Sequence, residues 1–428
     1  LYEPLAKKDD AAISKIVVSS ERFFHRIAYI FCGYLVLLIF LYPHFTNSGF
    51  PFYYTASLIA IIAVSTFAQY YFGITYQLLL NADQKAFVQM ALQSVTLLLN
   101  TGVSILLITK GFSIQAVKLS TAVIFLLRPI GQAVYVHTHY NIDKKIPFDG
   151  EPIKQKWNGF AQHVAGVVLV NTDVTVLTLL DSLKNVSVYS VYYSVVYGVE
   201  QAVMTFATGL EAMWGNMLAN HEQEQLVASF SATEWIVHNG VSFVFILTGI
   251  LIVPFVRVYT NGIADTNYTL PLFGMILTAA YAAECLRVPY FRMIKAAGHY
   301  KQTQTASIIE MLINVVLSVA LVKRFGLNGV AVGTLAAMLY HTCYFVWYLR
   351  TKILNRPIRF FCKYLAIDVF YALLCACLTR GFVLQELSYL AWVVLALKVG
   401  AVCLAVLIAV NCIFYRNTIR KFMQRRKK

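Results

Sequence analysis

The sequence has few charged residues: lysine, arginine, aspartate and glutamate make up 13% of its 428 residues, against about 25% in an ordinary soluble protein. Hydrophobic residues make up 59%. A chain of this composition has too few polar side chains to cover a soluble globule, so we exclude a soluble protein. Basic residues outnumber acidic ones by 35 to 20. In so hydrophobic a chain this excess indicates contact with anionic lipid, not with nucleic acid.

Sequence signatures of catalysis are missing as well. The chain contains no G-x-x-x-x-G-K-[ST] phosphate-binding loop, no C-x-x-C pair among its eight cysteines and no histidine cluster with metal-ligand spacing. The polar intervals between its apolar runs are too short to form a soluble catalytic domain. We therefore expect a protein that is not an enzyme and that holds no cofactor.

What the sequence does contain is a series of apolar runs long enough to cross the roughly 30 Å hydrocarbon layer as helices. Twelve such runs lie at 27–43, 54–80, 86–109, 113–138, 159–180, 186–210, 234–256, 269–291, 304–323, 328–348, 361–380 and 388–414. With residues 1–26 in the cytoplasm, 25 of the 35 basic residues fall on the cytoplasmic side, 6 outside and 4 within runs. The pattern predicts an all-α polytopic membrane protein with both termini in the cytoplasm.

The chain also repeats itself at a shift of 213 or 214 positions. The matching pairs, in order, are Leu5/Leu218, Ala6/Ala219, Glu21/Glu234, His25/His238, Thr46/Thr260, Asn47/Asn261, Tyr76/Tyr290, Ala82/Ala296, Asn100/Asn314, Val117/Val330 and Thr121/Thr334. Duplication within a membrane protein is typical of transporters built from two related halves. Because six runs separate each matching pair, an even number, we expect parallel repeats related by an axis along the membrane normal.

The repeat predicts the domain organisation. Residues 1–140 form a partial first lobe with four spans, 141–158 a cytoplasmic linker, and 159–350 a second lobe with six spans. An extra helix pair at 361–414 and a basic cytoplasmic tail at 415–428 follow. The first two spans of the second lobe have no counterpart in the first, so we expect the intact protein to have fourteen helices. The polar stretches 6–26 and 219–234 are expected to lie along the membrane surface as short helices.

Polar residues inside apolar runs cost a few kcal/mol unless they are paired or hydrated, which makes them the best candidates for function. Asp173 shares one helical face with Gln162, and Asn171 lies two residues before it. We interpret Asp173 either as a cavity carboxylate that binds a cation, a proton or a substrate hydroxyl, or as half of an ion pair with another helix. Gln162, Asn171 and the adjacent mid-span residues Glu200 and Gln201 are candidate cavity residues.

Two arginines within runs are candidate cations. Arg128 is followed by Pro129, which frees a backbone carbonyl and can kink the helix. Its guanidinium could hold a phosphate through a fork of donors or neutralise Asp173 or Glu200. Arg287 lies one turn after Glu284, so it is either a second cavity cation or part of a structural pair within its helix.

The segment Asn314-VVLSVALVKRFGLNGVAVGT-Leu335 resembles a recurrent passage of bacterial polysaccharide exporters. Ala297-Gly298-His299-Tyr300-Lys301 is similar to a stretch of the same proteins, as are Asn171-Thr172-Asp173 and Tyr189-Ser190-Val191-Tyr192. The family is the lipid-linked oligosaccharide flippases of the multidrug, oligosaccharidyl-lipid and polysaccharide exporter superfamily, and the resemblance covers about 1–356.

The resemblance implies two six-helix lobes around a hydrophilic cavity in the bacterial inner (plasma) membrane. It implies flipping of an undecaprenyl-pyrophosphate-linked glycan to the outer leaflet by alternating access, in some members coupled to an H⁺ or Na⁺ gradient. Glycosyltransferases and a polysaccharide polymerase would be its partners. The departure from the family pattern is the missing first two helices.

Two alternatives remain open from the sequence. A cation-coupled multidrug exporter of the same superfamily would favour cavity carboxylates without arginines. A membrane-embedded glycan ligase or polymerase would need long, charged outer loops, and the outer loops predicted here are short.

Overall fold

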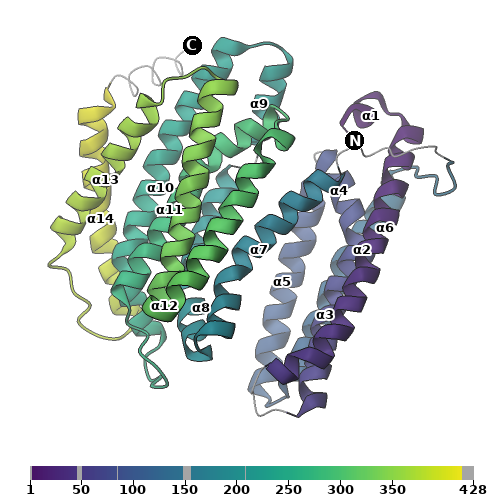
Figure 1. The fold of residues 1–428 in the computed structure, drawn as a ribbon, viewed down its shortest axis with the longest axis horizontal. Coiled ribbons are helices and arrows are strands. Elements are labelled where there is room, and N and C mark those ends of the chain that lie inside the picture. The colour runs from purple at the N-terminus through teal and green to yellow at the C-terminus, as the bar shows by residue number, and fades with distance from the viewer. Residues whose placement is uncertain (1, 46–50, 84, 148–155, 208, 417–428) are drawn as a thin grey trace. The chain divides into compact units, whose positions relative to one another are not determined.

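The computed structural model describes residues 2–45, 51–83, 85–147, 156–207 and 209–416, and every regular element within these ranges is a helix (Figure 1). Nine of the described segments are long and apolar enough to cross a membrane. The prediction of an all-α, multi-pass membrane protein is therefore confirmed.

The chain forms two compact units, Leu1–Lys156 (unit 1) and Trp157–Lys428 (unit 2). The division falls inside the polar interval 141–158. Unit 1 contains α1 (Tyr2–Lys7), α2 (Asp10–Phe45), α3 (Phe52–Ala68), the π-helical turn η1 (Gln69–Gly73), α4 (Ile74–Ala82), α5 (Ala86–Thr109) and α6 (Ile114–His139). Segments α3, η1 and α4 follow one another without a break and make one membrane crossing, Phe52–Ala82.

Unit 2 contains α7 (Lys156–Leu180), α8 (Leu183–Phe206), α9 (Leu210–Ala219), α10 (Gln223–Tyr259), α11 (Pro271–Ala296), α12 (Tyr300–Lys352), α13 (Arg359–Thr379) and α14 (Tyr389–Phe414). Helix α11 is its central helix, since 61% of its apolar window is buried, more than in any other described span. Polar side chains on α11 therefore lie in the interior of the unit.

Helix α12 is two antiparallel helices joined at Gly326. This glycine has φ 53° and ψ −132°, a conformation that only glycine adopts readily. The returning arm packs closely, because a Cβ on Gly333 would lie 2.6 Å from the Ser318 hydroxyl oxygen and one on Gly329 would lie 2.5 Å from the Leu321 carbonyl oxygen. The turn separates the two spans expected at 304–323 and 328–348. Gly329 and Gly333, spaced as G-x-x-x-G, allow these two spans to pack closely.

The expectation of surface helices at 6–26 and 219–234 is wrong. Residues from Asp10 onward belong to α2, and residues from Gln223 onward belong to α10, each continuous with its membrane-spanning part. The hydrophobic side chains Val17 and Phe230 in these polar stretches are buried, 1% and 0% exposed. They pack against the ends of neighbouring helices, which holds the stretches in line with the spans.

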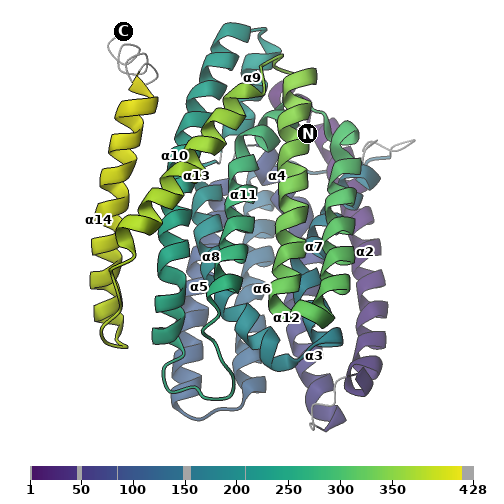
Figure 2. The ribbon, with the colours of Figure 1, turned by 60° about the vertical axis from the view of Figure 1, so that its left-hand side comes forward.

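The extra helix pair packs on α10 at the edge of unit 2 (Figure 2). Polar contacts reinforce this apolar interface. His238 Nδ1 lies 2.5 Å from the Asp368 carboxylate, and Trp235 donates a hydrogen bond of 3.1 Å to Asn411. Asp368 thus ties α13 to α10.

Candidate functional site

Arg128 lies on α6 in unit 1, immediately before the buried Pro129. Its Nε donates a hydrogen bond of 2.7 Å to the hydroxyl of Thr96 on α5, and its guanidinium stacks over Phe125 at 3.9 Å. These contacts hold the side chain but use only one of its five N–H donors. Within the described part of the chain, Arg128 lies in an apolar span and forms no ion pair.

Asp173 lies on α7 in unit 2 and is 3% exposed. Its carboxylate accepts hydrogen bonds from the hydroxyls of Tyr189 (2.9 Å) and Thr334 (2.7 Å) and from the amide of Asn314 (3.3 Å). Among the described residues no basic side chain pairs with it, so the ion pair considered from the sequence does not form there. Three neutral donors instead surround a buried carboxylate.

Two oxygens on α12 are buried without a hydrogen-bond partner in the described structure. They are Asn314 Oδ1, on the side chain that donates to Asp173, and Ser318 Oγ, one turn further along the helix. Both side chains are 0% exposed. Ser318 lies one turn beyond Asn314 on the same helix and touches Gly333, the neighbour of Thr334. Buried polar atoms are rarely left unsatisfied. The cluster therefore has spare oxygen ligands next to a carboxylate.

Arg287 lies on α11 and contacts three side chains through its two terminal nitrogens. Its Nη2 donates to Glu284 at 3.0 Å, and its Nη1 donates to Glu310 at 2.6 Å and contacts His341 Nδ1 at 2.7 Å. Glu310 Oε2 in turn lies 2.5 Å from His341 Nδ1. The pair with Glu284 that the spacing suggested is present, but Arg287 also joins α11 to both arms of α12.

The other candidates occupy different environments. Glu200 on α8 is 9% exposed and interacts electrostatically with Glu284 and Arg287. Asn171 and Gln201 are exposed on the surface of unit 2, and the Asn171 amide donates to the carbonyl of Val167 in its own helix. The side chain of Gln162 lies outside the described residues. The structure thus brings Glu200 and Arg287 into one cluster and leaves Asn171 and Gln201 apart from it.

The internal repeat relates the polar positions of the two units. A shift of 214 pairs Thr96 with Glu310, and a shift of 213 pairs Arg128 with His341. The structure shows the same contact at both places, Arg128 to Thr96 in unit 1 and His341 to Glu310 in unit 2. The same pair of positions thus holds an arginine and a threonine in unit 1 and a histidine and a glutamate in unit 2.

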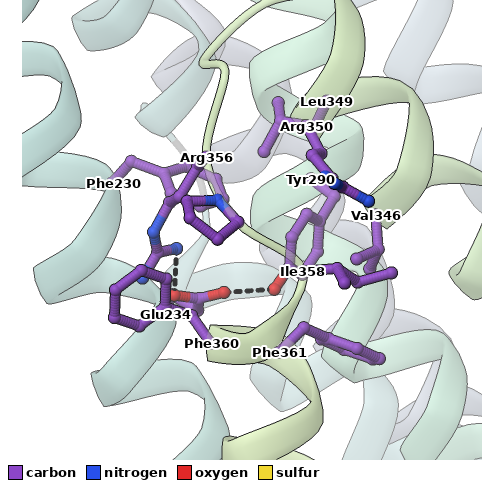
Figure 3. Close-up of a pocket in the computed structure, with 11 residues that line it drawn as sticks. Phe230, Glu234, Tyr290, Val346, Leu349, Arg350, Arg356, Ile358, Phe360 and Phe361 are labelled. Carbon is purple, nitrogen blue, oxygen red and sulfur yellow. Dashed lines mark hydrogen bonds and ion pairs between the residues drawn. The ribbon is translucent and has the colours of Figure 1, made fainter.

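A second repeated contact lies near the predicted cytoplasmic end of each unit. Tyr290 and Arg356 both donate to the carboxylate of Glu234 in unit 2 (Figure 3). In unit 1, Tyr76 donates to Glu21 at 3.0 Å, and Lys144 lies 3.5 Å from the same carboxylate. We call each set of acid, tyrosine and base a clasp. Each clasp joins the first long helix of the repeat to the segment that follows its last helix.

Sequence reasoning missed several residues that complete these sites. Tyr189 and Thr334 hold Asp173, Thr96 positions Arg128, and Glu310 with His341 surrounds Arg287. The repeat contained a signal for three of them, because Thr334 matches Thr121 and the pair Glu310 and His341 matches Thr96 and Arg128.

No protein-family model matches the chain, and no curated protein sequence matches it, but solved structures do. The lipid II flippase MurJ in an inward closed conformation aligns with a TM-score of 0.68 and 18% identity over 95% of this chain and 85% of that chain. An inward-facing multidrug resistance MATE family transporter of the MOP superfamily aligns with a TM-score of 0.62 and 13% identity, covering 83% and 84%. An outward-facing MATE transporter gives 0.58 and 14%, covering 83% and 85%. The chain therefore has the fold of these transporters.

Proposed function

We propose that the protein flips a lipid-linked oligosaccharide from the cytoplasmic to the outer leaflet by alternating access, for polysaccharide export. The undecaprenyl-pyrophosphate type of carrier is the substrate class that the chemistry favours. Such a molecule needs a cation for its pyrophosphate and an apolar path for its tail. Both are found among the described residues.

Arg128 is the observation that carries the proposal. A charged side chain in a span costs about 2.5–3.5 kcal/mol by insertion measurements, and among the described residues of unit 1 no carboxylate pairs with Arg128 to offset that cost. Thr96 and Phe125 hold its guanidinium in one position while leaving its terminal nitrogens available. A planar fork of donors fits two phosphate oxygens at once.

An apolar groove in unit 2 suits the lipid tail. It lies between α8 and α10, is bordered by Trp392 of α14 and has a volume of about 470 Å³. Val195, Leu247 and Phe255 are among its lining residues. A polyisoprenoid chain can occupy such a groove without any polar partner.

The cluster around Asp173 supports coupling of transport to a cation gradient. The Asp173 carboxylate, the Thr334 hydroxyl and the spare oxygens of Asn314 and Ser318 form an all-oxygen donor set, which suits Na⁺ or a proton. A bound cation would supply positive charge to the buried carboxylate, and these side chains would hold it.

The test is flipping of a fluorescent undecaprenyl-pyrophosphate oligosaccharide by the intact protein in liposomes. Loss of a charge-assisted contact of about 1.5–3 kcal/mol corresponds to a drop of about tenfold or more. We therefore expect Arg128→Ala to reduce flipping to background and Arg128→Lys to retain part of it, because lysine keeps the charge but not the fork.

Lys118 provides a matched control, since it is an exposed basic residue on the same helix. Lys118→Ala should flip at the wild-type rate. Full flipping by Arg128→Ala at equal protein levels would refute the anion-binding role.

A cation-coupled multidrug exporter is the second candidate. It is favoured by the excess of carboxyl groups over arginines around Arg287, which would attract an organic cation. In that case export of organic cations would depend on Glu200 and would be insensitive to Arg128→Ala. A glycan ligase or polymerase is the least supported function. Such an enzyme would need long, charged loops on the outer side, and the described loops predicted to lie there are short.

We place the protein in the bacterial inner (plasma) membrane with both termini in the cytoplasm, on the distribution of lysine and arginine. Glycosyltransferases that assemble the substrate and a polymerase that consumes it are the proposed partners. The polar intervals between the predicted spans are short, so these partners would meet the flippase through a shared lipid substrate.

A further inference from the structure

The ion cluster around Arg287 contains more carboxyl groups than cations. Glu200, Glu284 and Glu310 contribute three carboxyl groups, and Arg287 contributes one permanent positive charge. A net charge buried in a membrane is costly, and ionisable groups there become neutral by binding protons or partners. Neutrality of this cluster requires two protons, distributed over its carboxyl groups and His341.

Geometry places a hydrogen between two atoms of this cluster. Glu310 Oε2 and His341 Nδ1 lie 2.5 Å apart. An ionised carboxylate and an imidazole nitrogen without hydrogen would oppose two lone pairs at this distance. One proton must therefore lie between the two atoms, donated either by the imidazole or by the carboxyl group. Arg287 Nη1, which can only donate, contacts both partners and fixes their orientation.

The surroundings of this pair come from three helices. Glu284 and Arg287 on α11 and Tyr340 on α12 interact electrostatically with Glu310. Glu200 on α8 and Tyr281 on α11 interact with Glu284 and so belong to the outer part of the cluster. Side-chain exposure decreases from 18% at Glu284 to 10% at Arg287 and 4% at Glu310 and His341. The cluster thus has an accessible end at Glu284 and an enclosed end at the Glu310–His341 pair.

His341 has a second feature of a proton carrier. Its Nε2 is buried and has no hydrogen-bond partner among the described residues. An imidazole with one nitrogen engaged and the other free can accept a proton on one side and release it on the other.

We propose that the Glu310–His341 pair, held by Arg287 in the interior of unit 2, is a proton-binding site of this protein, loaded through Glu284 and Glu200. In the loaded state the pair carries two hydrogens, one between Glu310 Oε2 and His341 Nδ1 and one on His341 Nε2. Release of one proton leaves an ionised Glu310, paired with Arg287, beside a neutral imidazole whose remaining hydrogen lies on Nδ1. Proton binding at this site does not depend on what the protein transports. Its use to drive transport rests on the flippase function proposed above.

The experiment compares acid–base titration and infrared difference spectra of the purified wild type and of the variant Glu310→Gln with His341→Gln. We expect the wild type to release one proton more than this variant through the neutral range. We also expect a protonated-carboxyl band that Glu310→Gln removes. If Glu310→Gln does not fold, His341→Gln alone, which leaves both Arg287 ion pairs in place, should lose the same proton.

Glu234→Gln is the matched control, because it removes a buried carboxylate of the same unit that is paired with Arg356 outside the cluster. It should titrate like the wild type in this range. Identical titrations of wild type and cluster variants, with no change in the carboxyl band, would overturn the proposal.

Flipping assays separate this proposal from the flippase function. A wild type that titrates as expected but moves no lipid-linked oligosaccharide would refute the flippase and leave the proton site standing. A wild type that flips the oligosaccharide but titrates like the cluster variant would refute the proton site and leave the flippase function standing. If both hold, an imposed proton gradient should accelerate flipping by the wild type and leave the rate of the variant unchanged.

Discussion

At the scale of single residues, the two units differ most where the repeat aligns them. Gly73, Thr96 and Arg128 in unit 1 occupy the positions that Arg287, Glu310 and His341 occupy in unit 2. A contact between the aligned positions occurs in both units, while the side chains change from one cation, Arg128, to an arginine, a glutamate and a histidine that contact one another. The two proposals made above thus place anion selectivity and proton binding in different units.

The role of Asp173 can be tested separately from the proton site. Asp173→Asn retains the size of the side chain and removes the charge that a cation would need. We expect flipping by this variant to become independent of the imposed Na⁺ or H⁺ gradient that accelerates the wild type. The measurement is the flipping rate in liposomes with and without each gradient.

Asn171 offers the control for this experiment, since it lies two residues away on the same helix and is exposed. Asn171→Ala should retain the gradient dependence of the wild type. Unchanged gradient dependence in Asp173→Asn would contradict a coupling role.

The turn between α4 and α5 carries an exposed ion pair with a predictable pH dependence. Partial burial would raise the pKa of Asp83, but hydrogen bonds from Lys85 and Tyr140 and the charge of Lys85 outweigh it, so the pKa is lowered. The hydrogen bond to Asp83 raises the pKa of Lys85 to about 12. Because the pKa of Asp83 is lower in the folded protein, its ionised form stabilises the fold at every pH above the ordinary aspartate pKa of about 3.9.

The contribution of the Asp83–Lys85 pair to the free energy of unfolding should therefore be complete at neutral pH. It should disappear as the pH falls through the lowered pKa of Asp83. Because the side chains are 28% and 34% exposed, we expect it to be below about 1 kcal/mol. Asp83→Asn should lower the melting temperature slightly at pH 7 and leave it unchanged in strong acid. An equal difference at both pH values would contradict the assignment.

At the scale of elements, the clasps stabilise the two units to different degrees. The Glu234 side chain is 1% exposed and Arg356 12%, whereas Glu21 is 18% and Lys144 53% exposed. Breaking a buried ion pair by removing one partner costs about 3–5 kcal/mol, and breaking an exposed one costs about 0.2–1 kcal/mol. The glutamate of the clasp should therefore contribute more to the stability of unit 2, where it is Glu234, than to that of unit 1, where it is Glu21.

We predict that Glu234→Gln lowers the melting temperature of the purified protein much more than Glu21→Gln does. Replacing both partners, Glu234→Gln with Arg356→Gln, should recover part of the loss, because no buried charge is then left unpaired. Equal effects of the two single substitutions would show that burial does not decide the strength of the clasps.

At the scale of the whole molecule, hydropathy alone was sufficient to predict the helical class and the order of the spans. It also located the turn within α12, which follows from the apolar runs on either side of Gly326. The repeat predicted which residues would correspond. Glu21 with Tyr76 and Glu234 with Tyr290 make the same hydrogen bond in both units.

The candidate sites were less accessible from the sequence. Asp173 was identified as a buried polar residue, but its partners Asn314 and Thr334 lie 141 and 161 positions away, and no local pattern connects them. Arg287 was paired with Glu284 because i, i+3 spacing is visible in a sequence, whereas its contacts with Glu310 and His341 depend on how α12 folds back. The polar ends of α2 and α10 were misjudged because their few buried side chains, such as Val17, determine their course.

An arginine without an internal counter-charge also has an electrical consequence. A charge that moves through the membrane field changes in energy by about 2.3 kcal/mol for each 100 mV. In the transport cycle proposed above, an empty unit 1 would carry the positive charge of Arg128 through that field, and an anionic head group bound there would cancel it. Loaded and empty proteins would then respond differently to the membrane voltage, so the voltage itself would favour one direction of the cycle.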